Sequence, residues 1–142
     1  SMGGWVSALT AAHDKGLIAA AMISAGNMGK LGGLPRDQAV KLLRENGQES
    51  LAGTSPEIMA DEIIANKDAF DFAKAAPQLA GVNLFVLTSD DGLAFFSDEL
   101  VNGIKAAKGA KLKTLHVATD HSWSDSRIRL ESEIIDWLGT LR

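Results

Sequence analysis

The stretch Val82-Asn83-Leu84-Phe85-Val86-Leu87-Thr88 is an almost unbroken apolar run. A short apolar run bounded by turn residues is typical of a strand that is buried on both faces, as in a parallel sheet. The next residues, Ser89-Asp90-Asp91-Gly92, are polar and end in a glycine, which marks a turn. The run therefore predicts a buried parallel strand over 82–88.

The rest of the chain alternates between strand and helix patterns. Two further apolar runs predict strands at 17–24 and 112–118, and a glycine-rich stretch predicts a loop at 25–33. Ser55, Ser97 and Ser122 are placed to cap helices, Ser122 with Asp125 in a pattern like a capping box. The predicted helices cover 3–14, 35–46 with an end at Gly47, 56–66, 67–80 with an interruption at Pro77, 98–108, and a closing segment that starts at Ser122.

Strands that alternate with helices predict right-handed crossovers and a parallel sheet covered by helices on both faces. We therefore expect a single α/β domain over 1–142, with a parallel sheet of about three strands. The helical block at 34–80 is much longer than a simple crossover requires, and we expect it to be an insertion within that domain.

Composition excludes several classes of function. The 142-residue chain has a net charge of −4 and no Lys/Arg run, which argues against a nucleic-acid partner. No apolar stretch reaches the roughly 18–20 residues needed to span a membrane. The chain has no cysteine, and its three histidines lack the spacing of a zinc site. The glycines at 26–32 do not match a dinucleotide or phosphate loop. We therefore expect no cofactor, no metal and no membrane contact.

Residues suited to chemistry follow two of the predicted strands. Asp90 and Asp91 follow the strand at 82–88, and His121 follows the strand at 112–118. The carboxyl ends of parallel strands share one edge, where open α/β sheets bind ligands. A carboxylate there can orient the histidine so that it accepts a proton from a hydroxyl nucleophile. By contrast, His116 alternates with Leu115 and Val117, so we expect a packed strand residue.

Three segments in order resemble the α/β-hydrolase family. The run 84–91 is similar to its late strand and acid-bearing turn. The run 115–125, followed by a helix ending in 135–138, resembles its last strand, catalytic-histidine loop and closing helix. Ser1-Met2-Gly3-Gly4-Trp5 resembles the second half of its nucleophile motif. The block at 34–80 falls where that family inserts its cap.

The resemblance implies a serine hydrolase acting on a small-molecule carboxylic ester or a related acyl bond. By position, Ser1 corresponds to the nucleophile, His121 to the base and Asp91 to the acid, with Asp90 as the alternative acid. The backbone N–H of Met2 corresponds to one oxyanion donor. The chain corresponds to the C-terminal half of that fold, so the strand before the nucleophile and the second oxyanion donor are missing. We therefore expect little or no activity from these 142 residues alone.

A non-catalytic interaction module is the alternative hypothesis. The predicted strand at 17–24 would form an exposed sheet edge, which can pair with another chain. Under this hypothesis the chain forms a homo-oligomer through that edge or pairs with a missing N-terminal half. A free-standing flavodoxin-like domain would need more strands than the sequence supplies.

Overall fold

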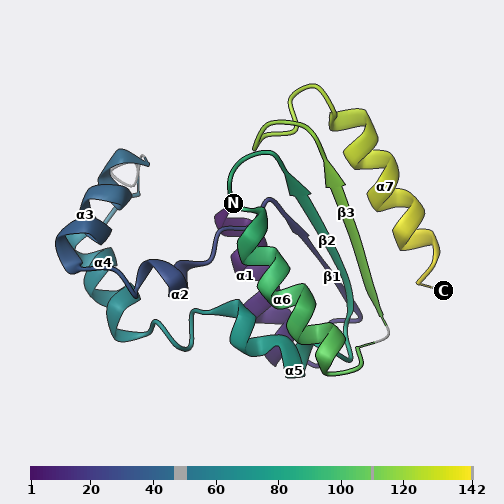
Figure 1. Cartoon of the computed structure of the whole chain (residues 1–142), viewed down its shortest axis with the longest axis horizontal. Helices are drawn as coiled ribbons and strands as arrows, with labels where there is room; N and C mark the ends of the chain where they lie inside the picture. The colour runs from purple at the N-terminus through teal and green to yellow at the C-terminus, as the bar shows by residue number, and fades with distance from the viewer. Residues whose placement is uncertain (47–50, 110, 142) are drawn as a thin grey trace. The chain divides into compact units, whose positions relative to one another are not determined.

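The computed structural model describes residues 1–46, 51–109 and 111–141. It is an α/β structure with an open parallel sheet of three strands in the order β1-β2-β3, flanked by helices (Figure 1). This confirms the predicted fold class. The elements are α1 (Met2–His13), β1 (Ala19–Ile23), α2 (Met28–Leu31), α3 (Arg36–Glu45), α4 (Pro56–Ala65), the 3₁₀ helix η2 (Phe72–Ala75), α5 (Ala76–Leu79), β2 (Asn83–Ser89), α6 (Ala94–Ala106), β3 (Leu112–Val117) and α7 (Arg127–Gly139).

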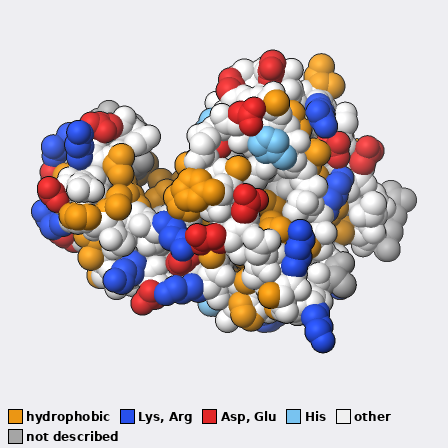
Figure 2. All heavy atoms as spheres, in the orientation of Figure 1, with side chains coloured by type: hydrophobic (Ala, Val, Ile, Leu, Met, Phe, Trp, Pro, Cys, Tyr) orange, Lys and Arg blue, Asp and Glu red, His pale blue; other side chains and the backbone are white. Residues whose placement is uncertain are grey.

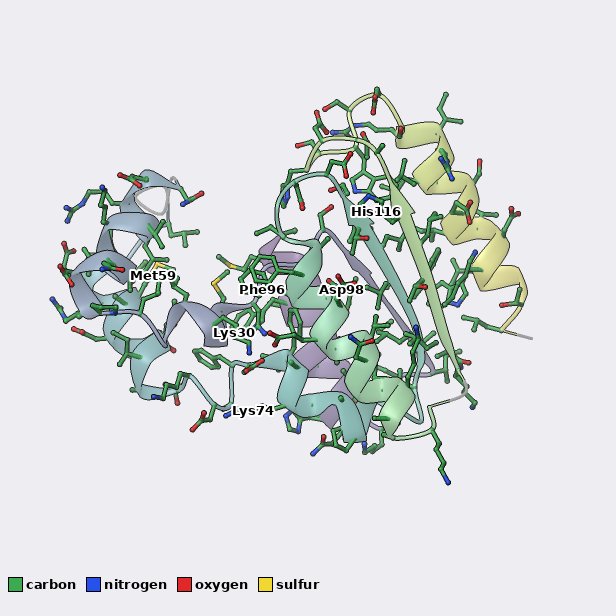
Figure 3. All side chains as sticks on the ribbon, viewed as in Figure 1. Lys30, Met59, Lys74, Phe96, Asp98 and His116 are labelled. Carbon is green, nitrogen blue, oxygen red and sulfur yellow. The ribbon has the colours of Figure 1, made fainter. Side chains whose placement is uncertain are left out.

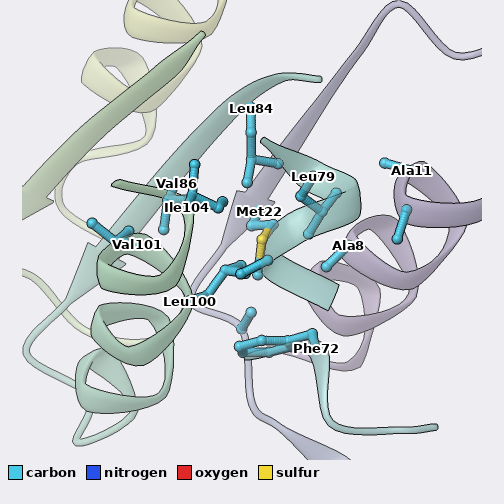
Figure 4. Close-up of a cluster of buried hydrophobic side chains, with 13 residues drawn as sticks. Ala8, Ala11, Met22, Phe72, Leu79, Leu84, Val86, Leu100, Val101 and Ile104 are labelled. Carbon is cyan, nitrogen blue, oxygen red and sulfur yellow. The ribbon is translucent and has the colours of Figure 1, made fainter. Parts of the chain in front are cut away.

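Strand β2 lies at the centre of the sheet and is buried on both faces. It pairs in parallel with β1 from Ala19↔Asn83 and with β3 from Leu84↔Leu112. Successive side chains of a strand point to opposite faces. Leu84 and Val86 pack with α1, η2, α5 and α6 in the main core, shown in close-up in Figure 4. Phe85 and Leu87 pack with Trp137 of α7 on the other face.

The chain separates into two compact units. One consists of 1–26 and 72–141 of the described residues and holds the sheet. The other, Asn27–Asp71, holds α2, α3 and α4. The helical block predicted at 34–80 is thus divided between the two units. Helices α3 and α4 belong to the smaller unit, whereas η2 and α5 pack in the core of the sheet-bearing unit.

The smaller unit has its own apolar core. Its buried residues are Ala39, Val40, Leu43, Ala60 and Ile63. Ser55 caps α4, because its hydroxyl accepts a hydrogen bond of 3.2 Å from the N–H of Ile58, as predicted. The glycine-rich stretch predicted as a loop contains the short helix α2. A Cβ on Gly32 would lie 2.6 Å from the carbonyl oxygen of Ile63, so the glycine permits close packing against α4.

Two predicted helix starts are wrong. Helix α6 begins at Ala94, and Ser97 is buried inside it; the N–H of Leu93 is instead bound by the Asp91 carboxylate at 2.9 Å. Helix α7 begins at Arg127 and not at Ser122. Trp123 has a φ of 56°, which is incompatible with a right-handed helix and ends any helix started at Ser122.

Three smaller predictions have different outcomes. The helix predicted over 67–80 begins only at Phe72, with η2. Pro77 lies in the first turn of α5, where proline fits, so it begins a helix and does not interrupt one. Gly47, the predicted end of the helix at 35–46, lies outside the described residues.

The surface mixes charges of both signs. On the face shown in Figure 2, acidic and basic side chains are interspersed. Within the parts of the chain that the structure describes, no helix is both long and apolar enough to cross a membrane.

Candidate active site

The carboxyl ends of the three strands meet at one edge of the sheet. Because the strands are parallel, the loops after β1, β2 and β3 begin at this edge. They carry Ser24, the Asp90-Asp91 pair and His121 respectively. The N–H of Asp90 bonds the carbonyl of Thr119 at 3.0 Å, which joins the second loop to the third.

Asp91 and His121 form a hydrogen-bonded pair. The distance from His121 Nδ1 to Asp91 Oδ2 is 2.7 Å. The Asp91 side chain is 4% exposed, whereas that of His121 is 47% exposed. The other carboxylate oxygen of Asp91 accepts the hydrogen bond from the N–H of Leu93. Both oxygens of the acid are therefore held, while the imidazole remains open to solvent.

The environment of Asp91 favours its ionised form. Burial is the largest influence and acts to raise its pKa. Hydrogen bonds from the N–H of Leu93 and from His121, together with the nearby Ser89 hydroxyl, act in the opposite direction and lower the pKa below its ordinary value. An ionised carboxylate only accepts hydrogen bonds, so Nδ1 of His121 must carry a hydrogen. In the neutral ring, Nε2 then has a free lone pair. No hydrogen bond reaches Nε2 within the described part of the chain.

Asp90 has a different partner. Its Oδ1 lies 3.0 Å from His116 Nε2, and His116 Nδ1 lies 2.9 Å from Thr88 Oγ1. Figure 3 shows His116 near the carboxyl end of β3. The prediction that His116 is packed is wrong, because its side chain is 52% exposed. Of the two acids left open by the sequence, the structure brings Asp91 against His121 and turns Asp90 toward His116.

Ser1 lies at the same edge of the sheet. It precedes the first residue of α1, and its nitrogen donates a hydrogen bond to the carbonyl of Ser24. Burial lowers the pKa of its amino group, and the negative charge of Asp91 acts against that shift, so the two groups interact electrostatically. Among the described residues, no hydrogen bond joins the Ser1 hydroxyl to His121. Ser1 is therefore near the pair without being bonded to its imidazole.

The start of α1 supplies backbone donors at this edge. Met2 is the first residue of the helix, so its N–H is among the four that have no acceptor within the helix. The helix dipole adds positive potential at the same end. Such a position can stabilise a developing negative charge on a substrate oxygen.

Gly4 determines how closely α1 approaches β1. A Cβ at this position would lie 2.7 Å from the Cβ of Ala25 and 3.2 Å from the carbonyl oxygen of Ile23. Nothing larger than hydrogen fits there without moving the helix. The absence of a side chain at Gly4 therefore holds the start of α1, with Ser1 and Met2, against the carboxyl end of β1.

Three buried polar residues behind the pair were missed by sequence reasoning. Ser24, Ser89 and Trp123 are each no more than 2% exposed. Trp123 Nε1 donates to Ser24 Oγ at 3.0 Å, and Ser24 Oγ lies 2.8 Å from Ser89 Oγ. In the sequence, Ser24 and Ser89 each close an apolar run. That pattern fits an ordinary strand end equally well, so it does not by itself predict the hydrogen bonds.

Comparisons of the chain with protein-family models, with curated proteins and with solved structures found no match. Among the described residues, no group of three or more His, Asp and Glu side chains is arranged to bind a metal ion. The chemistry available at this edge of the sheet therefore has to follow from the distances and hydrogen bonds of its residues.

Proposed function

We propose that this chain carries the catalytic residues of a serine hydrolase that cleaves carboxylic esters or related acyl bonds. The observation that carries the proposal is the 2.7 Å hydrogen bond between His121 Nδ1 and the buried carboxylate of Asp91, beside the start of α1. This arrangement leaves Nε2 of the half-exposed His121 ring without a hydrogen-bond partner among the described residues, at the edge of the sheet where Ser1 also lies.

The reaction proceeds in two halves. Ser1 Oγ attacks the carbonyl carbon of the ester while Nε2 of His121 accepts the hydroxyl proton. The carbonyl π electrons move to the oxygen, and the N–H of Met2 stabilises that negative charge. Collapse of the tetrahedral intermediate breaks the bond to the leaving alcohol, which takes the proton from Nε2. A water molecule then repeats the sequence on the acyl-enzyme and releases the acid and the free hydroxyl.

The charge of Asp91 supports each proton transfer. It stabilises the imidazolium form of His121 and keeps the ring in the tautomer with hydrogen on Nδ1. Its lowered pKa means that it is ionised at neutral pH. Asp90, bonded to His116, has no part in the proposed reaction.

The test uses the product of the complete reading frame that contains residues 1–142, with a fluorophosphonate probe and a p-nitrophenyl ester. We expect the probe to label Ser1, and Ser1→Ala to abolish both labelling and hydrolysis. Asp91→Asn is expected to lower kcat by about 10³–10⁴-fold, because the histidine is then held in the wrong tautomer. Its matched control, Asp90→Asn, is expected to keep wild-type kcat within about threefold, because the exposed Asp90 side chain binds His116 and not His121.

A second pair of variants repeats the comparison at the histidines. His121→Gln is expected to eliminate hydrolysis, and His116→Gln to preserve it. Labelling that persists in Ser1→Ala contradicts the proposal. Equal losses in Asp90→Asn and Asp91→Asn contradict it as well.

A second candidate function is association through the outer edge of β1. In the described part of the chain β1 pairs with β2 alone, and Ile18 just before it is 75% exposed. An unpaired strand edge is a template for a further strand. Light scattering after size-exclusion chromatography is expected to show a species larger than a monomer, and Ile18→Lys is expected to reduce it. A monodisperse monomer at micromolar concentration contradicts this candidate.

A further inference from the structure

The sheet-bearing unit has a hollow of about 340 Å³ between α6 and the strands β2 and β3. Its lining includes Val86 of β2 and Val101 of α6, which are 2% and 8% exposed. Figure 3 labels two other residues of the lining, Asp98 on α6 and His116 on β3. Binding sites for small molecules typically enclose roughly 300–1,000 Å³, so the hollow has room for a small ligand.

Helix α6 contributes three polar side chains to the lining of the hollow. Asp98, Asn102 and Lys105 are spaced four and three residues apart, so they share one face of the helix. A helix rises about 1.5 Å per residue, which separates the backbones of Asp98 and Lys105 by about 10 Å along its axis. The hollow therefore has a carboxylate toward one end, an ammonium group toward the other and an amide between them.

Several polar side chains of the lining are without partners. In the described part of the chain, no hydrogen bond or ion pair engages the side chains of Ser97, Asp98, Asn102, Lys105 and Thr114. Ser97 differs from the other four, which are exposed, because it is only 1% exposed. A buried hydroxyl without a hydrogen bond leaves its desolvation cost uncompensated, so a ligand group that reaches it gains affinity.

The opposite wall of the hollow is already hydrogen-bonded within the protein. His116 Nε2 lies 3.0 Å from Asp90 Oδ1, and His116 Nδ1 lies 2.9 Å from Thr88 Oγ1. The carboxylate accepts the hydrogen of Nε2, so in the neutral ring Nδ1 accepts from the Thr88 hydroxyl. The groups left for a ligand are therefore those of α6 and Thr114.

The opposite charges of Asp98 and Lys105 select the class of ligand. A simple anion would face the Asp98 carboxylate, a simple cation would face the Lys105 ammonium group, and a neutral sugar would pair with neither charge. A zwitterion can place its ammonium group beside Asp98 and its carboxylate beside Lys105. Between them, Asn102 can both donate to and accept from a peptide bond. An extended peptide spans at most about 3.3–3.6 Å per residue, so about three residues match the separation along α6.

We propose that the hollow between α6, β2 and β3 binds a short zwitterionic peptide of about three residues through Asp98, Asn102 and Lys105. The buried hydroxyl of Ser97 supplies a further hydrogen bond once the peptide is bound. The hollow is separate from the candidate active site, because neither Asp91 nor His121 lines it. The proposal does not rest on the hydrolase function.

The experiment titrates the product of the complete reading frame that contains residues 1–142 with trialanine, N-acetyl-trialanine and trialanine amide. Amide chemical shifts in NMR spectra report binding and its location. Asp98→Asn and Lys105→Gln each remove one charge from the hollow. Their matched controls are Glu131→Gln and Lys108→Gln, at exposed residues outside its lining. Ser97→Ala tests the buried hydroxyl.

We expect trialanine to bind saturably at millimolar concentration or below and to shift amides of α6 and β3. In the wild type and both controls, blocking either terminus should weaken binding about twofold to fivefold, as expected for one exposed ion pair. Asp98→Asn should weaken trialanine by the same factor and remove the effect of acetylation, because the ammonium group has already lost its partner. Lys105→Gln should do the same for amidation. Ser97→Ala should weaken all three peptides without destabilising the free protein, since its hydroxyl has no partner to lose.

Three results overturn the proposal. The first is a failure of trialanine to saturate the wild type at millimolar concentration. The second is an effect of acetylation that is as large in Asp98→Asn as in the wild type, or of amidation that is as large in Lys105→Gln. The third is a set of shifts confined to residues 90–93 and 119–123, which would place the peptide at the candidate active site. The blocked peptides test the same contacts on the unaltered protein, so the outcome does not depend on the folding of any variant. No measurement uses ester hydrolysis, so failure of the hydrolase proposal leaves this result standing.

Discussion

The fit of α1 against β1 can be tested at two adjacent glycines. Gly3 and Gly4 are both in the first turn of α1, so alanine gains the same helix propensity at either position. They differ in what a Cβ would meet. At Gly3 the nearest atom is Ser1 Oγ at 3.7 Å, whereas at Gly4 it is the Cβ of Ala25 at 2.7 Å.

The expected free energies follow from these distances. Replacing glycine with alanine inside a helix raises the free energy of unfolding by up to about 1 kcal/mol. Gly3→Ala should therefore stabilise the fold by up to about 1 kcal/mol. Apolar carbons pack best at about 3.5–4.0 Å, so Gly4→Ala must move α1 away from β1 by roughly 1 Å. Overpacking of this kind costs about 1–3 kcal/mol, which should make Gly4→Ala less stable than Gly3→Ala by that amount.

Urea unfolding at neutral pH measures the difference directly, with Gly3→Ala as the control. The displacement also moves Ser1 relative to His121. A misplacement of about 1 Å can cost a factor of about 10² in rate, so labelling by the fluorophosphonate probe should slow in Gly4→Ala but not in Gly3→Ala. Equal stability of the two variants would refute the reasoning, since it would mean that α1 does not depend on contact at Gly4.

Three further predictions concern the Asp91 carboxyl, the cap of α4 and the main core. Because the pKa of Asp91 is lowered on folding, the ionised side chain adds stability above its ordinary value of 3.8, and this stability is lost as pH falls through the lower folded pKa. Asp91→Asn should therefore lose less stability than the wild type when urea unfolding is repeated from roughly pH 5 down to pH 2. Ser55→Ala should destabilise α4 by about 1 kcal/mol and speed hydrogen exchange of its first amides, while Ser55→Asp keeps the cap. Leu100→Ala, at a fully buried position, should cost about 2–5 kcal/mol in thermal unfolding, against about 0.5 kcal/mol or less for Ile128→Ala, which is 82% exposed.

The sheet could be predicted because its signals are local. The apolar run at 82–88 corresponds to β2, and the runs at 17–24 and 112–118 contain β1 and β3. Their alternation with helices implies a parallel sheet, and a parallel sheet brings the loops after the strands to one edge. The meeting of a carboxylate from the 90–91 pair with His121 follows from that topology.

Helix starts were less predictable, because a serine can cap a helix only if the backbone before it is free to turn. At Ser55 it is, and the cap forms. At Ser97 the preceding residues already belong to α6, whose first turn follows the bond from the Leu93 N–H to Asp91. At Ser122 the left-handed conformation of Trp123 prevents a helix.

By itself, the sequence determined the fold class, the positions of the three strands along the chain and the edge at which Asp91 and His121 lie, because these depend on hydrophobic periodicity and on the geometry of parallel strands. The expectation that Ser1 lies at the same edge came only from the resemblance to the α/β-hydrolase family. Tertiary structure alone decided which acid faces which histidine. Asp90 and Asp91 are adjacent, so their partners depend on the turn before α6 and on how His116 and His121 are presented by β3 and its loop. It also decided the hydrogen bonds from Trp123 through Ser24 to Ser89, because those residues are distant in the chain and meet only when three strand ends pack together.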